Sequence, residues 1–210
     1  MKKFVYILFL LFPFVSLFSQ DDKEAAKIVD DFIALIQSNP IQADFTLKIL
    51  NEHDQPVQTQ NGTFTMKGNK FRFDLNEVEV FYNGKTQWSY METVNEVTIT
   101  EPTEKELAEI HPLIILTEYR KHYTILFSKK ETSPTEYIID MVSNIPANEF
   151  EEMEIVFRKT DKKITSIQVW GAGFKMIVEF NKFESGVNVN DSFFVFDKSK
   201  YKDVFENDLR

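Results

Sequence analysis

The chain has 210 residues, a formal net charge of −9 at pH 7 and no cysteine. Without cysteine there are no disulfide bonds, thiolate metal sites or cysteine nucleophiles. A nucleic-acid-binding face needs a basic footprint, so the acidic balance argues against a nucleic-acid partner. The apolar fraction of 43% is too high for a disordered chain, which leaves one ordinary globular domain with or without a tail.

Residues 1–20 have the composition of a secretory signal. Two lysines form a short basic start, an almost unbroken apolar run follows over residues 4–18, and small and polar residues end the segment. This order is typical of a cleaved signal peptide, and the apolar run is shorter than the roughly 20 residues that cross a bilayer. We expect export with cleavage near Ser19 or Gln20, leaving residues 21–210 as a single domain. The alternative is an uncleaved N-terminal anchor.

The apolar residues that follow are spaced first as in a helix and then as in strands. Over residues 25–36 they recur every three or four positions, which predicts an amphipathic helix that ends before Pro40. After Pro40 they alternate with polar residues, and tight-turn signals separate the runs at Gly68 and at Asn83-Gly84. This alternation predicts an antiparallel sheet that is buried on one face.

A helical insertion interrupts the strands in the middle of the chain. Thr103 and Glu106 have the spacing of a capping box, and Pro112 suits the start of a second helix. Alternating strands then resume and continue to a last strand marked by Phe194 and Phe196, before a polar tail. The fold class is therefore predicted to be α+β, a large antiparallel sheet of about 11 strands with helices on one face.

Recognisable catalytic and ligand-binding motifs are missing from the sequence. His53, His111 and His122 lack the spacing of metal ligands, and there is neither a nucleophile elbow nor a phosphate-binding glycine loop. Carboxylates crowd residues 149–154, but their alternation on a strand favours a solvated face over an acid–base pair. We expect no catalytic residue, no metal and no cofactor, and hence no enzyme.

The apolar stripes consist largely of Phe, Met, Leu and Ile, whose side chains have no hydrogen-bond donor that needs a partner. A packed core explains such stripes for most individual residues. A surface of the same composition also suits hydrocarbon, and helices packed on a curved sheet can move aside to leave an apolar hollow.

Five short segments on consecutive predicted strands carry a further signal: Ala43-Asp44-Phe45, Gly62-Thr63-Phe64, Lys70-Phe71-Arg72-Phe73, the hairpin over residues 82–90, and Asn95-Glu96-Val97. They resemble the LolA family, periplasmic carriers of outer-membrane lipoproteins. Residues 191–197 are similar to the family's final strand, and residues 201–210 to the closing segment of its Bacteroidetes-type members. The resemblance spans most of residues 25–210, and the hairpin with Trp88 is its most specific part.

The resemblance implies an incomplete antiparallel β-barrel, a half-barrel, whose concave face is covered by the N-terminal helix and the mid-chain helical insertion. It also implies that acyl chains of lipoproteins occupy this face as an apolar trough. The expected lipid-binding residues of the trough are Phe45, Phe64, Phe71, Phe73, Trp88 and Tyr90. The expected residues of the helical lid are Ile28, Phe32, Leu107, Ile110 and Leu113.

The resemblance further implies a monomer that shuttles acylated lipoproteins through the periplasm, from an inner-membrane lipoprotein-releasing transporter to an outer-membrane acceptor. An alternative remains open on the same fold: a periplasmic binding or sensor module for another amphiphile, such as a glycolipid. One departure affects the lid. Where family members latch it with an arginine beside a proline, this chain has Lys67, which cannot make a planar bidentate contact.

Overall fold

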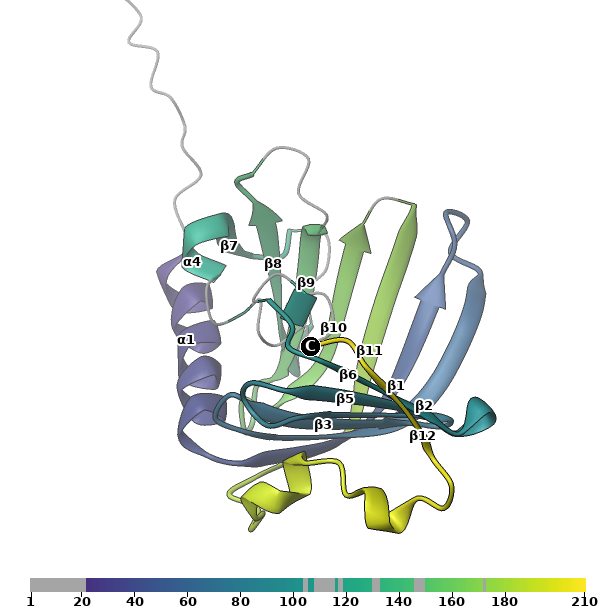
Figure 1. Ribbon diagram of the computed structural model, residues 1–210. Helices are drawn as coiled ribbons and strands as arrows, with labels where there is room; N and C mark the ends of the chain where they lie inside the picture. Colours follow the sequence, from purple (N-terminus) through teal and green to yellow (C-terminus); the bar gives the residue numbers. More distant parts are fainter. Residues whose placement is uncertain are drawn as a thin grey trace, which may run out of the picture.

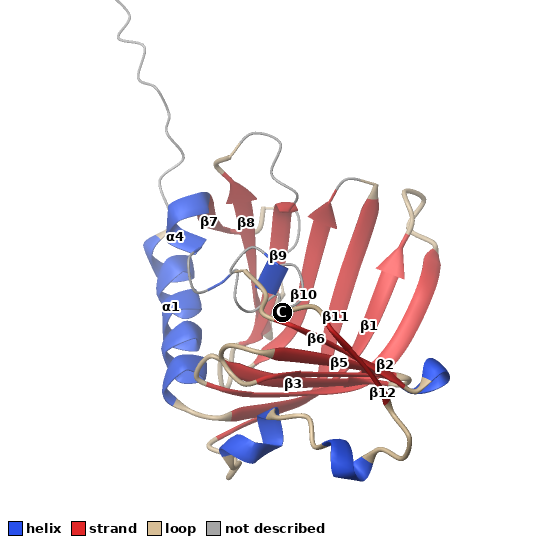
Figure 2. Ribbon diagram, in the orientation of Figure 1, coloured by secondary structure: helices blue, strands red, loops and turns tan. Residues whose placement is uncertain are grey.

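The computed structural model describes residues 22–103, 106–107, 116, 119–129, 133–145, 150–171 and 173–210. The predicted signal segment, residues 1–20, lies outside them. Strands make up most of the described chain and helices are few, as Figure 2 shows. Within the described ranges, no helix has the length and apolar composition needed to cross a bilayer.

Within the described residues, twelve strands form one sheet. In chain order they are β1 (Ile41–Leu50), β2 (Pro56–Lys67), β3 (Lys70–Leu75), β4 (Val78–Tyr82), β5 (Gln87–Met91), β6 (Glu96–Thr100), β7 (Tyr123–Phe127), β8 (Glu136–Ser143), β9 (Phe150–Arg158), β10 (Ile164–Gly171), β11 (Phe174–Ser185) and β12 (Phe205–Asp208). Their order across the sheet is β12-β6-β5-β4-β3-β2-β1-β11-β10-β9-β8-β7, so β7 and β12 are edges and the curved sheet is open (Figure 1). The large antiparallel sheet is confirmed, with 12 strands instead of about 11.

The two predicted tight turns are present. Gly68 joins β2 to β3 with a φ of 61°, a left-handed conformation that glycine adopts without strain. Between β4 and β5, the side-chain oxygen of Asn83 accepts hydrogen bonds from the backbone N–H groups of Lys85 and Thr86, at 3.0 and 2.9 Å. Local turn chemistry therefore fixes both hairpins, and the second of them contains the most specific part of the sequence pattern.

The amphipathic helix α1 (Lys23–Ser38) is also confirmed. The Asp22 carboxylate caps it by accepting hydrogen bonds from the backbone N–H groups of Glu24 and Ala25, at 3.0 and 3.3 Å. Its apolar residues face one side and are buried against the sheet: Ala25, Ala26, Ile28, Val29, Phe32, Ile33 and Ile36. Burial of this stripe holds the helix on the concave side of the sheet.

The predicted capping box lies at the start of the helical insertion. The Glu106 carboxylate accepts hydrogen bonds from the backbone N–H and hydroxyl of Thr103, at 2.7 and 2.8 Å. Most of the insertion lies outside the described residues. Beyond it, the short helix α4 (Tyr119–His122) contacts α1, because the Tyr119 hydroxyl donates to Asp30 at 2.6 Å and Arg120 forms an ion pair with the same carboxylate.

The prediction of a last strand at Phe194 and Phe196 is wrong. Phe194 ends a 3₁₀ turn, η2 (Asp191–Phe194), and Phe196 lies in irregular backbone, yet both side chains are buried. Burial of the side chains therefore produced the alternation, without strand pairing. The final strand is instead β12, in the tail predicted to be polar, and it pairs in parallel with β6.

Apolar clusters lie on both faces of the sheet. The concave cluster combines the buried face of α1 with inward side chains of β1–β4 and β7–β11. The outer cluster lies on the opposite face of β4–β6, beneath residues 187–204, which we call the C-terminal strap (Figure 1). Its members are Phe81, Tyr90, Val97, Phe196 and Val204, with Trp88 and Tyr201 packed against them.

Candidate functional site

Four of the six predicted trough residues form one aromatic group on the concave face. Phe73 is at its centre, with ring centroids 4.6 Å from Phe64, 5.5 Å from Phe71 and 6.3 Å from Phe45. These rings come from β1, β2 and β3. The register of β2 and β3 places Phe64 directly opposite Phe73, which brings their rings together. Alternation along the strands therefore gathers the phenylalanines as the sequence predicted.

A glycine makes this gathering possible. Gly62 of β2 is the partner of Phe45 on one side and Leu75 on the other. A Cβ placed on Gly62 would lie 2.9 Å from Cζ of Phe45 and 2.7 Å from the backbone oxygen of Asp74, closer than real Cβ contacts. The missing side chain lets the Phe45 ring lie across β2 toward Phe73.

The concave face is only partly covered. Phe45, Phe64 and Phe71 are almost completely buried, whereas Phe73 is half-buried. Further half-buried apolar side chains pack beside it on β1, β3, β4 and β11. Together they form what we call the open apolar patch: Leu47, Phe73, Leu75, Val80, Met176 and Phe180. These side chains pack against the concave cluster and leave part of their surface uncovered.

α1 fills the adjacent part of the concave face. Phe32 packs its ring against Phe157 of β9 and Phe183 of β11, with centroid distances of 5.4 and 5.8 Å. Ile28, also predicted in the lid, is buried in the same cluster, and so is Leu107 of the insertion. The other predicted lid residues, Ile110 and Leu113, lie outside the described residues.

Trp88 and Tyr90 do not lie with the other predicted trough residues. In β5 they face the outer cluster, where Trp88 pairs with Phe81 and Tyr90 packs 4.5 Å from the ring of Tyr201. The physical reason is that β4 ends in two buried aromatics, Phe81 and Tyr82, on opposite faces. The hairpin register pairs Phe81 with Trp88 and Tyr82 with Gln87. The apolar residues of β5 therefore share the outer face with Phe81, although the alternation predicted them on the concave face with Tyr82.

The concave positions of β5 and β6 nearest Tyr82 are therefore polar. Register places Gln87 and Ser89 of β5 beside Thr100 and Thr98 of β6, on the same face as Tyr82. This strip is not expected from the sequence, because the apolar alternation of β5 predicts that Trp88 and Tyr90 face the trough. The usable signal is the Phe81-Tyr82 pair, since two consecutive buried aromatics leave the face of the next strand undetermined.

Lys67 does not face the helical cover. Its ammonium forms an ion pair with Asp191 at 2.9 Å and donates to the backbone oxygen of Val189 at 3.1 Å, both in the C-terminal strap. Lys70 joins the same carboxylate at 2.6 Å. Hydrogen bonds from Lys70 and Lys67 lower the pKa of Asp191 from 3.8 to about 2. In this chain the lysine fastens the strap to the outer face.

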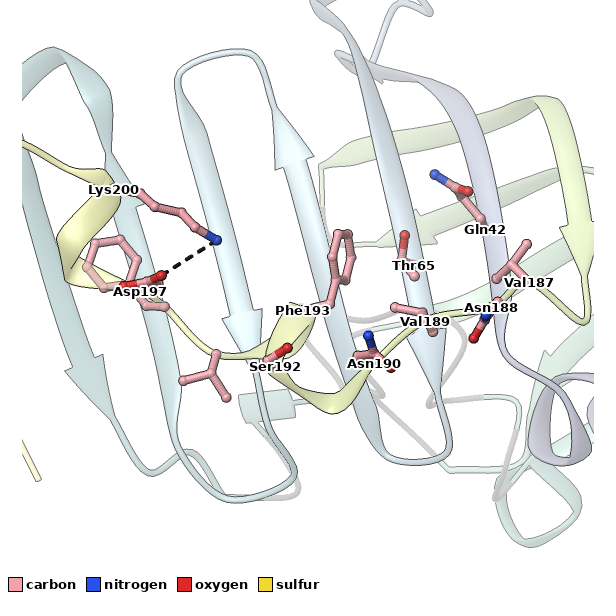
Figure 3. A pocket seen from close by; sticks show the side chains of 12 residues that line it. Gln42, Thr65, Val187, Asn188, Val189, Asn190, Ser192, Phe193, Asp197 and Lys200 are labelled. Atoms are coloured by element: carbon pink, nitrogen blue, oxygen red, sulfur yellow. Dashed lines mark ion pairs between the residues drawn. The ribbon is translucent and has the colours of Figure 1, made fainter.

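A pocket of about 720 Å³ lies between the strap and the outer face of β1 and β2 (Figure 3). Its walls are mixed, with amide and hydroxyl groups beside apolar strap residues. The lining residues are Gln42, Thr65, Val187, Asn188, Val189, Asn190, Ser192, Phe193, Val195, Phe196, Asp197 and Lys200. Nothing in the sequence pattern predicts this pocket, because it forms only where the strap crosses the sheet.

The expectation of a solvated carboxylate face is wrong for Glu154. This residue of β9 is 6% exposed, and its cross-strand partner Asp140 of β8 is 9% exposed. Gln168 of β10 donates a hydrogen bond to the Glu154 carboxylate at 2.8 Å. The side chains of Asp140 and Gln168, its cross-strand partners in β8 and β10, flank Glu154 on the same face of the sheet.

Comparison with known families decides the identity of the fold. A family model described as "Outer membrane lipoprotein carrier protein LolA" matches residues 15–172, which is more than half of the chain. The chain belongs to the LolA family.

Three proteins are similar to this LolA family member over most of its length. A protein from Idiomarina loihiensis named "Outer-membrane lipoprotein carrier protein" is 22% identical over 213 residues, covering 97% of this chain and 98% of the relative. An uncharacterized conserved protein from Thermus thermophilus has a crystal structure with a TM-score of 0.56 and 12% identity, covering 87% of this chain and 98% of that chain. This second similarity shows a shared fold. A LolA superfamily protein from Nitrosomonas europaea covers 82% of this chain and 97% of its own, at a TM-score of 0.45 and 10% identity.

Proposed function

We propose that this protein binds acyl chains of lipoproteins on the concave face of its sheet and carries them through an aqueous compartment. The observation that carries the proposal is the open apolar patch, which lies beside the aromatic group on the face of the sheet where α1 buries its apolar side. Membership of a family described as outer membrane lipoprotein carriers supports lipoprotein as the cargo. The proposed role requires binding and release without covalent chemistry.

The physical need for a carrier follows from the hydrophobic effect. Each buried methylene contributes about 0.8 kcal/mol, so exposing a 16-carbon acyl chain to water costs on the order of 12 kcal/mol. An apolar face shielded by a helix lowers this cost. Because the side chains of α1 already occupy part of that face, an incoming acyl chain displaces protein contacts, which keeps net affinity modest and allows release.

Binding on this face requires α1 to be held without being locked. Its apolar stripe is buried, while its polar side is attached through Asp30 to α4 and through Asp31 to Lys162, at 3.7 Å, in the turn between β9 and β10. Exposed ion pairs of this kind contribute little stability. We propose that α1 and the helical insertion move as the cover when cargo enters.

The cellular setting belongs to the same proposal. The signal-like segment of residues 1–20 supports export to the periplasm. There, an inner-membrane lipoprotein-releasing transporter would load the carrier and an outer-membrane acceptor would unload it. The family description supports a carrier of outer-membrane lipoproteins. The two membrane partners and a monomeric carrier are part of the proposal.

Substitution of Phe73 tests acyl binding. Phe73→Glu places a charge in the open apolar patch, where it would have to be desolvated by acyl chains, so we expect more than tenfold weaker binding of a palmitoylated lipopeptide. Displacement of an apolar-pocket dye by the lipopeptide measures the effect. Because Phe73 is half-buried, a moderate loss of thermal stability is expected without loss of the fold.

Phe205→Glu is the matched control, because Phe205 is 64% exposed on the edge strand β12. It should bind the lipopeptide as the parent does. Equal binding by Phe73→Glu and the parent would contradict the proposal. Native mass spectrometry of protein purified without detergent gives a second test, with acyl-chain masses expected on the parent.

A further inference from the structure

The concave face is itself amphipathic. From β1 to β4 its side chains are mainly apolar, whereas the positions of β5 and β6 nearest Tyr82 carry an amide and hydroxyls, with Met91 and Glu96 farther along the same face. The change occurs between Tyr82 of β4 and Gln87 of β5, which are cross-strand partners. Tyr82 packs its ring 5.1 Å from that of Phe71, so the polar strip begins directly beside the aromatic group.

Gln87 has an unused hydrogen-bonding group inside this strip. The residue is 7% exposed, and its Nε2 donates to the Ser89 hydroxyl at 3.1 Å. Its Oε1 is shielded from solvent and has no hydrogen-bond partner in the described part of the chain. If the amide were reversed, its NH₂ group would be the one left over, so half of the carboxamide is unpaired in either orientation. A buried unpaired polar group is costly, and such groups in native proteins call for an explanation.

The surroundings of Gln87 select for a neutral group. Ser89, Thr98 and Thr100 are uncharged, and the phenol of Tyr82 stays neutral because burial raises its pKa. An ionised group would lose its hydration here without an opposite charge from these neighbours. A polar group that reaches Gln87 must also enter beside Phe71, which favours one attached to an acyl chain over a freely soluble molecule.

We propose that Gln87, supported by Ser89, binds the neutral polar linkage next to the acyl chains of the cargo, an amide or a hydroxyl-bearing glycerol. This rests on the proposed function, because the acyl chains would occupy the aromatic group and the open apolar patch. The Gln87 carboxamide then completes its hydrogen bonds only when cargo is present. It therefore favours binding of amphiphiles over plain hydrocarbon, and it determines which end of the cargo lies at β5.

Three palmitoyl probes of equal chain length test this inference: N-palmitoylethanolamine, 1-monopalmitoylglycerol and methyl palmitate. The first presents an amide and a hydroxyl, the second presents hydroxyls, and the third has no donor. We expect the parent to bind one or both donor probes about five- to tenfold more tightly than methyl palmitate, the gain typical of one hydrogen bond. The difference between the first two probes distinguishes an amide linkage from a glycerol linkage.

Gln87→Leu should abolish the preference and leave affinity for methyl palmitate unchanged or higher. Leucine has a similar volume and removes the unpaired group, so the thermal midpoint should not fall. If this variant misfolds, Ser89→Ala is the second test, and we expect it to reduce the preference for the donor probes over methyl palmitate by a smaller amount. Gln42→Leu is the matched control, because Gln42 is exposed on the outer face of β1.

The outcomes separate the two proposals. A Gln87→Leu protein that keeps the preference of the parent overturns the inference and leaves carrier function intact. Equal binding of all three probes by the parent likewise overturns the inference and leaves carrier function intact. Failure of every palmitoyl probe to bind the parent would overturn the proposed function, and this inference would fall with it.

Discussion

Phe45 reaches the aromatic group because the position it crosses is glycine. The Phe45 ring lies over Gly62, with its Cζ 2.9 Å from where a Cβ would be. The ring then meets Phe73 nearly at right angles, 89°, a favourable edge-to-face contact. The Gly-x-Phe segment of β2 therefore has a physical role: the glycine opens a passage and the phenylalanine two residues on, Phe64, fills the same face.

Gly62→Ala tests this passage. The new methyl group would contact the Asp74 backbone oxygen as well as the Phe45 ring, and backbone cannot move aside cheaply. We expect a loss of about 1–3 kcal/mol in the free energy of unfolding, measured by urea denaturation. Asn61→Ala, at the exposed preceding position, should change it by less than about 0.5 kcal/mol. A neutral or stabilising Gly62→Ala would show that the ring has room to move.

At the scale of elements, each face of the sheet is closed by a different segment. α1 closes part of the concave face through apolar contacts that lack hydrogen-bond direction. The C-terminal strap closes the outer face through specific contacts. The Asp191 carboxylate forms ion pairs with Lys67 and Lys70. The guanidinium carbon of Arg72 lies 4.5 Å from the ring centroid of Phe81 and 4.8 Å from that of Phe193. Both segments are held mainly by buried apolar side chains, seven on α1 and Phe194, Phe196 and Val204 on the strap.

Acid should loosen the strap. The pKa of Asp191 is lowered in the folded state to about 2, so its contribution to stability is complete above its ordinary pKa of 3.8 and is lost as the pH falls from 3.8 to about 2. Trp88 lies under the strap, and with Trp170→Phe it becomes the single tryptophan. We expect its emission to shift to longer wavelength over this range of pH.

Asp191→Asn should show a smaller acid-induced shift than the parent, because the titrating carboxylate is gone. Asp208→Asn is the matched control. The pKa of Asp208 is also lowered to about 2, but its partner is Arg210 at the end of the chain. If Asp191→Asn and the parent titrate identically, the strap is not held by this carboxylate.

At the scale of the whole molecule, one curved sheet separates two apolar interiors. The concave cluster contains the proposed cargo site, whereas the outer cluster joins β4–β6 to the strap. Phe73 packs its ring against Phe45, Phe64 and Phe71, and Phe196 packs against rings of the outer cluster. A molecule built in this way can rearrange one face while the other keeps the sheet intact.

Additivity of two substitutions tests this separation. Phe73→Ala should cost about 1–2 kcal/mol in the free energy of unfolding, and Phe196→Ala about 3 kcal/mol. The double variant should equal their sum to within about 0.5 kcal/mol, because residues on opposite faces act independently. Only Phe73→Ala should weaken acyl binding. A coupling above about 1 kcal/mol would show that the two faces are not independent.

Much of the fold and part of the site were predictable from local sequence. The three- and four-residue spacing of Ile28 and Phe32 predicted α1, and the turn residues Gly68 and Asn83 predicted two hairpins. The four phenylalanines of β1–β3 were gathered as predicted. Their role in lipid binding stays a prediction, as do the roles of the lid residues.

The remaining features depend on contacts between distant segments. β12 has no apolar alternation, and it is a strand because β6 offers it an edge. The pocket and the outer cluster exist because the strap returns across the sheet. The ion pair of Lys67 with Asp191 joins residues far apart in the chain, so no local sequence pattern predicts it.

The periods, the turns and the chemical character of each strand follow from neighbours within a few residues, so the amino-acid order alone predicts them. Which face of the sheet each side chain occupies depends instead on packing between strands. A single step in register moves every side chain of a strand to the other face, and the consecutive aromatics Phe81 and Tyr82 left that choice open. Packing settled it, placing Trp88 and Tyr90 outside and Gln87 inside, beside the aromatic group.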